Sequence, residues 1–210
     1  MLAATGHVRG KSLSLSSSDC VLRLLAALAV VIVGPLAPSL RAASAAKVRD
    51  LSGRVVDPRP GPGAPPSVLV FTRTDCPVSN RYAPELRRLH QRFAPAARFW
   101  LVYPDPTEEV AAIERHRREF GFGFAALRDP GHALVGLTGA TVTPEVAVLV
   151  AGRDGPLMVY RGRIDDRAVE VGRTRPRPTT HDLEDVLASL AAGGTPTPRT
   201  TRAVGCIISP

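Results

Sequence analysis

The residue best suited to chemistry is Cys76, which lies where an apolar run of the sequence meets a helical pattern. The run Val68–Phe71 ends a few residues before the cysteine, and Pro77 is followed by two leucines three positions apart, Leu86 and Leu89. This order predicts a strand, a tight turn and a helix, with the thiol at the N-terminus of the helix. Backbone N–H groups and the helix dipole stabilise a thiolate at that position, so the pattern indicates sulfur chemistry.

Several neighbouring side chains bear on the reactivity of this thiol. Ser79 stands three residues after Cys76, where a C-x-x-C site has its second cysteine. Its hydroxyl can donate to the sulfur but cannot resolve a mixed disulfide, so a C-x-x-S site stays trapped until another thiol arrives. Arg73 and Arg81 would favour the thiolate if they pointed at the sulfur, and Asp75 would oppose it.

The other candidate thiol is Cys206, close to the end of the sequence. About 14 residues separate it from the last predicted helix, and an extended segment of that length reaches roughly 45 Å. A domain of this size has a radius of gyration of about 15 Å. Cys206 can therefore reach Cys76 or a second molecule, and the spacing does not decide whether either bridge forms.

The elements that must position these residues follow from hydrophobic periodicity and from turn residues. The predicted helices cover residues 77–93, 107–120, 129–137 and 181–192, with a kink or a broken first turn at Pro84 in the first and Thr107 as candidate N-cap of the second. Strands are predicted at 67–72, 97–103, 124–127, 145–151 and 157–163, with a short leading strand within 47–56. A β-α-β start, a hairpin and a closing helix give an α/β fold with a central mixed sheet and helices on both faces.

One further pair fits this layout. Thr143 and Pro144 come directly before the strand that starts at residue 145. The proline is a candidate for a cis peptide bond. In the predicted sheet, the start of this strand lies beside the turn that carries Cys76.

The two ends of the sequence differ from the predicted domain at 47–192. Residues 1–46 carry basic residues, an apolar run at 24–37 and an Ala-Ser-Ala-Ala sequence at 43–46, which is the pattern of a secretory signal peptide. The run is shorter than the ~20 residues that span a bilayer, and an uncleaved membrane anchor is the alternative. Cleavage would remove Cys20 and place the domain in an exported, periplasmic or extracytoplasmic location where disulfides form. Residues 193–210 are predicted to be a flexible tail.

Composition argues against several other classes of function. The 27 Lys and Arg residues exceed the 19 Asp and Glu residues by 8, but the arginines are dispersed. No basic module with interleaved aromatic residues is present, so we expect no nucleic-acid partner. No Cys or His pair has the spacing of metal ligands, so we predict neither a metal nor a cofactor, and His132 and His181 are interpreted as surface or capping residues.

Taken together, the segment from 67 to 192 resembles the thioredoxin-like redoxins, specifically the group of alkyl hydroperoxide reductase and thiol-specific antioxidant domains. The resemblance rests on the strand and turn before Cys76, on the sequence LRDPGHALV at 127–135, on Thr143-Pro144 before an apolar strand, and on the hairpin turn at 154–155 with YRGRI at 160–164. It implies a nucleophilic role for Cys76 and a cis-proline at Pro144 that, with Thr143, binds the backbone of a partner.

Differences from related families reduce the number of reactions that the sequence supports. Ser79 replaces the second cysteine of thioredoxins and disulfide isomerases. Leu69 and Arg73 stand where peroxiredoxins have the proline and the Thr or Ser that precede their cysteine. Sco-type copper proteins carry C-x-x-x-C and a distant histidine, whereas Asn80 occupies their second cysteine position here, with His132 in a comparable region.

Two functional hypotheses remain open, beside a third in which the chain is a plain structural domain and Cys76 affects only stability. In the first, the chain is an exported thiol-disulfide oxidoreductase of the antioxidant redoxin type, with weak peroxidase activity as a variant. Cys76 is its nucleophile, Cys206 a resolving thiol, and its substrates are protein thiols and disulfides or small oxidised thiols. In the second, the fold is a non-catalytic module that docks a partner or delivers copper. A membrane is a partner only if the N-terminal segment is uncleaved.

Overall fold

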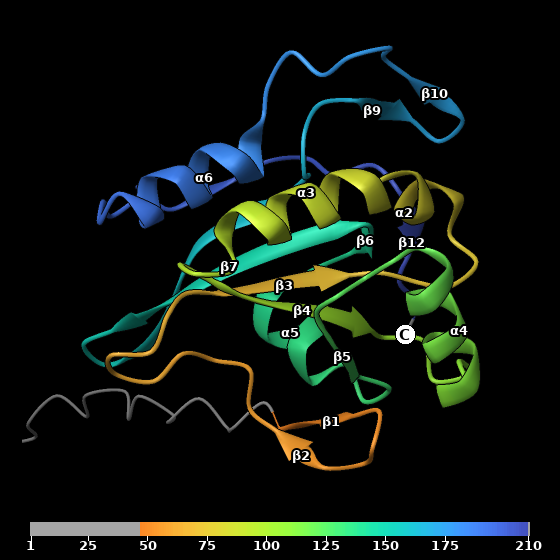
Figure 1. The fold of residues 1–210 in the computed structure, drawn as a ribbon, viewed down its shortest axis with the longest axis horizontal. Helices are drawn as coiled ribbons and strands as arrows, with labels where there is room; N and C mark the ends of the chain where they lie inside the picture. The colour runs from red at the N-terminus through yellow and green to blue at the C-terminus, as the bar shows by residue number, and fades with distance from the viewer. Residues whose placement is uncertain (1–46, 210) are drawn as a thin grey trace, which may run out of the picture. The chain divides into compact units, whose positions relative to one another are not determined.

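The computed structural model describes residues 47–209, which are built around an eight-stranded mixed sheet (Figure 1). Its strands are β1 (Val48–Asp50), β2 (Val55–Val56), β3 (Ser67–Phe71), β4 (Arg98–Tyr103), β5 (Ala125–Arg128), β7 (Glu145–Gly152), β8 (Gly155–Gly162) and β11 (Arg199–Thr200). They lie in the order β11-β8-β7-β3-β4-β5-β1-β2. β3, β4 and β5 are parallel, and β7 is antiparallel to both β3 and β8. This confirms the predicted mixed sheet.

The central strand β3 separates two hydrophobic cores. Its apolar side chains alternate between the faces of the sheet, as strand geometry requires: Val68 and Val70 belong to one core, and Leu69 and Phe71 belong to the other. All four are fully buried. Both faces of β3 must therefore be covered, which explains why its sequence is continuously apolar and does not alternate with polar residues.

Helices provide that cover on both faces (Figure 1). α3 (Ala83–Phe93) and α6 (Asp182–Ala191) lie over one face, and their leucines pack in the core that contains Val68. α5 (Ala133–Thr138) lies over the other face, where Leu134 joins the core that contains Leu69. α4 (Val110–Glu119) packs Ile113 into the first core near the end of β4.

Of the two alternatives predicted at Pro84, the structure shows a broken first turn. The helix after the cysteine is divided into α2 (Pro77–Arg81) and α3, and Tyr82 joins them. Proline lacks the N–H that would continue the helix, and its ring clashes with the preceding turn. Only the short helix α2 therefore stands behind the thiol, so the dipole expected from a helix over 77–93 is reduced to that of little more than one turn.

Some predicted boundaries are wrong for local reasons. Thr107 does not cap α4, because its N–H and hydroxyl both donate to Asp105 Oδ1, at 2.8 and 2.6 Å, in a turn that precedes the helix. Glu109 is the N-cap. α5 begins later than expected, because Asp129 accepts the N–H groups of Ala133, Leu134 and Val135 from outside the helix. The leading segment is a β1–β2 hairpin.

The segment after α6 contains two short paired strands, where its sequence predicts a flexible tail. β11 adds to the sheet in parallel with β8, and β12 (Cys206–Ile207) pairs with β6 (Val142–Thr143). The remaining two-stranded sheet consists of β9 (Ala168–Glu170) and β10 (Arg173–Thr174), between β8 and α6. In Figure 1, β12 lies beside β6 and below α2.

The predicted signal peptide at 1–46 lies outside the described residues. Within residues 47–209, no helix combines the length and apolar character needed to cross a membrane.

Candidate functional site

Cys76 lies at the N-cap position of α2, where the sequence places it. Its backbone is extended, with φ −78° and ψ 110°, and its Sγ accepts the Ser79 N–H at 3.5 Å. Pro77 occupies the first helical position, where a missing N–H costs no hydrogen bond. The cysteine side chain is buried, with 1% exposed. The local turn therefore aims a helix N–H at the sulfur and shields it from water.

The thiol is joined to β6 across the fold. Cys76 Sγ donates to the Thr143 carbonyl oxygen at 3.0 Å, although the two residues are 67 positions apart. The Thr143–Pro144 peptide bond is cis, as predicted. The strand that follows this bond, β7, pairs with β3, which leads to the cysteine. The pairing of these central strands brings the two ends of the site together.

Cys206 completes the site from the other end of the chain. In the antiparallel pair of β12 and β6, Cys206 is directly opposite Thr143, and Ile207 is opposite Val142. The residue that accepts a hydrogen bond from Cys76 is thus also the pairing partner of Cys206. Both cysteines are free thiols, Cys76 buried and Cys206 half-buried.

The two thiols have opposite tendencies to ionise. Burial opposes ionisation of Cys76, but hydrogen bonds from Cys206, Ser79 and Thr143 outweigh it and lower its pKa to about 7. Burial raises the pKa of Cys206 to about 12, and the hydrogen bond to Cys76 and the charge of the Cys76 thiolate add to this effect. When the pair of thiols loses one proton, that proton therefore leaves Cys76, and Cys206 stays protonated.

Two hydroxyl groups beside the sulfur are available to the charged form. The Ser79 and Thr143 side chains are buried, and their hydroxyl oxygens have no hydrogen-bond partner among the described residues. Both contribute hydrogen bonds that lower the pKa of Cys76. A buried hydroxyl without a partner is costly. Ionisation of Cys76 supplies the missing acceptor, so these groups are arranged for the thiolate.

The charged residues before the cysteine act differently from the sequence expectation. Arg73 forms ion pairs with Asp75 at 3.1 Å and with Asp105 at 3.3 Å. Its charge is therefore shared between two carboxylates. Arg73 and Asp75 do contribute to the pKa of Cys206, which Arg73 lowers and Asp75 raises.

A polar network that the sequence does not predict supports the turn that carries Cys76. His116 Nδ1 is 2.8 Å from the Tyr103 hydroxyl, and His116 Nε2 is 2.8 Å from Asn80 Oδ1. Asn80 Nδ2 donates to the Thr74 carbonyl at 3.0 Å, and the Thr74 N–H donates to Glu108 Oε1 at 2.6 Å. Burial lowers the pKa of His116 and raises that of Glu108. No spacing in the sequence links these residues, since they come from separate elements.

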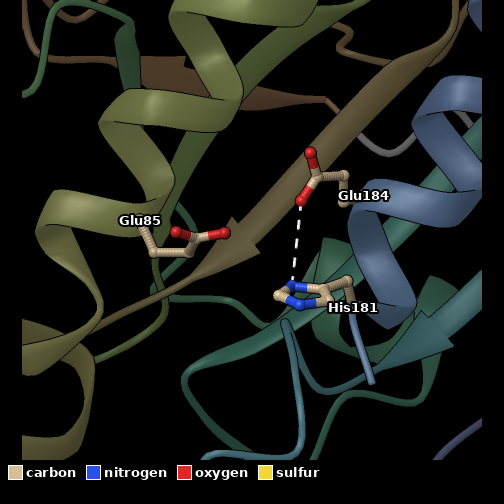
Figure 2. A group of neighbouring side chains, drawn as sticks. All are labelled: Glu85, His181 and Glu184. Carbon is tan, nitrogen blue, oxygen red and sulfur yellow. Dashed lines mark ion pairs between the residues drawn. The ribbon is translucent and has the colours of Figure 1, made fainter. Parts of the chain in front are cut away.

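Another cluster holds charges without contacting the cysteines. Glu85, His181 and Glu184 place possible ligand atoms within 4.8 Å of one another (Figure 2). His181 Nδ1 faces Glu184 Oε2 at 3.8 Å across the start of α6. Arg88 already bridges both carboxylates, at 2.7 Å to Glu85 and 2.5 Å to Glu184, and Arg92 also pairs with Glu184. The cluster is an ion-pair network that joins α3 to α6.

The histidine considered for copper binding has a structural contact. His132 Nε2 lies 3.1 Å from the Pro104 carbonyl. Across residues 47–209, the cluster at Glu85 is the one place where three or more such ligand atoms meet. His132 therefore does not join Cys76 and Cys206 in a three-ligand set within that range.

Comparison with known proteins identifies the fold. No protein-family model and no curated protein matches this chain. Among solved structures, it is similar to an uncharacterized conserved protein from Geobacillus kaustophilus, with 22% identity, a TM-score of 0.64, and coverage of 78% of this chain and 87% of that one. A hypothetical protein from Sinorhizobium meliloti has 19% identity, a TM-score of 0.62, and coverage of 77% and 88%. A candidate thioredoxin from Neisseria meningitidis has 15% identity, a TM-score of 0.50, and coverage of 70% and 87%. The chain has the predicted thioredoxin-like α/β fold.

Proposed function

We propose that this chain is an exported thiol-disulfide oxidoreductase in which Cys76 is the nucleophile and Cys206 the resolving thiol. The observation that carries the proposal is the meeting of the two thiols at Thr143, on strands that are distant in sequence. A thiol whose pKa lies near 7 is well suited to attack a disulfide at neutral pH, because it is both ionised and nucleophilic. Export is supported by the signal-peptide pattern at 1–46.

The first step is attack of the Cys76 thiolate on one sulfur of a substrate disulfide. A bond forms between Cys76 Sγ and that sulfur, the substrate S–S bond breaks, and the second substrate sulfur leaves as a thiolate that takes up a proton. The hydroxyls of Ser79 and Thr143 stabilise the attacking thiolate. The product is a mixed disulfide between the chain and the substrate.

The second step uses Cys206. Once Cys76 is in a mixed disulfide it carries no charge, so its thiolate no longer raises the pKa of Cys206. The Cys206 thiolate then attacks Cys76 Sγ, a Cys76–Cys206 disulfide forms, and the second substrate thiolate is released. The substrate has gained two electrons and the chain has lost two. An external dithiol reverses the exchange and returns the chain to its reduced form.

A single-turnover titration tests this scheme. The full chain, with Cys20→Ser so that only the two site cysteines react, is mixed with excess aromatic disulfide, and the released thiol is measured by absorbance. We expect two thiols released per chain, and one thiol plus a stable mixed disulfide at Cys76 for Cys206→Ser. Cys76→Ser serves as the control and should release no thiol in the rapid phase. Release of two thiols without an intramolecular disulfide would contradict the scheme.

A further inference from the structure

The C-terminal strand closes the site that it helps to form. Cys76 is only 1% exposed in the described structure, and β12 covers the edge of β6 at Thr143. Attack on a substrate disulfide needs in-line access to Cys76 Sγ. The substrate must therefore take a place beside Thr143 that Cys206 now holds.

β12 lies along β6 in the way that an extended substrate segment bound to this strand would lie. Cys206 is placed at the nucleophile, and the Ile208 N–H donates to the Thr141 carbonyl at 3.0 Å, which continues the pairing beyond Ile207. Ile207 is 73% exposed, whereas Ile208 is half-buried against the core beneath α5. Strand pairing supplies the affinity in this mode of recognition, and alternate side chains supply the selectivity.

Gly205 fixes a steric requirement on any segment in this register. A Cβ at Gly205 would overlap the carbonyl group of Thr143, and backbone atoms cannot give way as a flexible side chain can. The residue before the reactive cysteine must therefore be glycine for the segment to lie this close to β6.

The segment before β12 limits how far the strand can move. Thr201 is held at the sheet edge, where its hydroxyl lies 2.7 Å from the Tyr160 hydroxyl and accepts the Arg163 N–H at 3.2 Å. The Thr201 N–H donates to the Arg161 carbonyl at 2.9 Å. Four residues lie between Thr201 and Cys206, and the five Cα–Cα steps form a tether of roughly 17 Å when extended. A released Cys206 thus stays at high effective concentration near Cys76.

We propose that β12 is a tethered mimic of the substrate, which exchanges with an extended substrate segment on β6. The segment it mimics has glycine before its disulfide-bonded cysteine and an apolar residue two positions after that cysteine. The inference rests on the proposed function and adds its substrate class and its order of events. Substrate binding displaces β12, and the return of β12 carries Cys206 to the mixed disulfide as it expels the reduced segment.

The test uses Gly205→Ala, which should detach β12 while keeping Cys206, in the full chain with Cys20→Ser. Gly61→Ala is the matched control, because a Cβ at Gly61 meets nothing within 4 Å. The probe is the symmetric disulfide of the capped peptide Gly-Cys-Ser-Ile, and the readout is the rate of adduct formation at Cys76. This rate is divided by the fraction of Cys76 that is ionised, which the pH dependence of the reaction gives for each variant. Loss of hydrogen-exchange protection at the Ile208 N–H verifies detachment, and a melting curve verifies folding.

We expect Gly205→Ala to react at least fivefold faster than the unsubstituted chain, and Gly61→Ala to react at the unchanged rate. The same variant should prefer the Gly-Cys-Ser-Ile disulfide over that of Ala-Cys-Ser-Ile by at least fivefold. Equal rates for Gly205→Ala and the unsubstituted chain, or equal rates for the two peptides, would overturn the inference. Either result would leave the proposed function standing, because Cys76 would still react. A folded chain whose Cys76 reacts with neither peptide at any pH would overturn the proposed function itself.

Discussion

The substitution Ser79→Ala tests whether the buried hydroxyl beside Cys76 stabilises the thiolate. The Ser79 side chain is 3% exposed, and its hydroxyl has no other partner among the described residues. A hydrogen bond from this hydroxyl to the sulfur lowers the pKa of Cys76. A hydrogen bond to a charged group contributes about 1.5–3 kcal/mol. Because one pKa unit corresponds to about 1.4 kcal/mol, the pKa of Cys76 should rise by about one to two units.

The consequence at neutral pH is large. With its pKa near 7, about half of Cys76 is thiolate at about pH 7. After Ser79→Ala, that fraction should fall to between roughly one-tenth and one-hundredth. The assay is the ultraviolet absorbance of the thiolate as a function of pH, with Cys76→Ser as the blank. Cys206 does not interfere near neutral pH, because burial is the largest cause that raises its pKa and this burial is present whether or not Cys76 is ionised.

Ser67→Ala provides a matched control. Ser67 is also buried, with 2% exposed and a hydroxyl that lacks a partner, but it lies at the opposite end of β3 from the cysteine. The pKa of Cys76 should not change in this variant. A Ser79→Ala pKa that equals that of the Ser67→Ala control would refute the argument that the hydroxyls are arranged for the thiolate.

The remaining predictions concern stability. Tyr82→Phe removes the hydroxyl that donates to buried Asp165 Oδ1 at 2.6 Å and accepts the Ala168 N–H at 3.2 Å. The free energy of unfolding, measured by urea titration, should fall by about 1–3 kcal/mol. An unchanged midpoint would contradict this prediction. Burial lowers the pKa of His116 in the folded state. The neutral His116 side chain therefore contributes its full stability above the unfolded pKa of about 6.5, and this contribution is lost as pH falls toward the folded pKa. The loss is at most about 1.4 kcal/mol per pH unit. Urea titrations of His116→Gln should show a flatter dependence on pH over that range, and an equal slope would count against the buried neutral imidazole.

The fold was predictable because its signals are local. The apolar run of β3 and the break before Pro84 each follow from residues close together in sequence, whereas the cis bond at Pro144 was expected from the resemblance to thioredoxin-like redoxins. Boundaries were less predictable, because side chains outside an element set its start. Asp129 accepts three N–H groups at the beginning of α5, and Asp105 withdraws Thr107 from the capping position.

The site was predictable in its residues but not in its assembly. Cys76, Ser79, Thr143, Pro144 and Cys206 are all candidates by type and spacing, and the structure brings them together, whereas their catalytic roles stay predictions. Tail length alone shows that Cys206 can reach Cys76, but not that strand pairing places it there.

The polar network around His116 could not be predicted from the sequence, for a different reason. His116 and Asn80 are 36 residues apart, and their hydrogen bond depends on how α4 packs against the end of α2. Each residue has an ordinary helical role when read alone. Only packing turns the two into support for the turn that carries the nucleophile.

Disulfide mapping of the full chain after mild oxidation in the folded state tests the central claim most directly. The proposed function predicts an intramolecular bond between Cys76 and Cys206 at every protein concentration, since β12 pairs Cys206 with the residue that Cys76 contacts. Cys76 left as a free thiol, or linked only to a second chain in a concentration-dependent manner, would contradict the account.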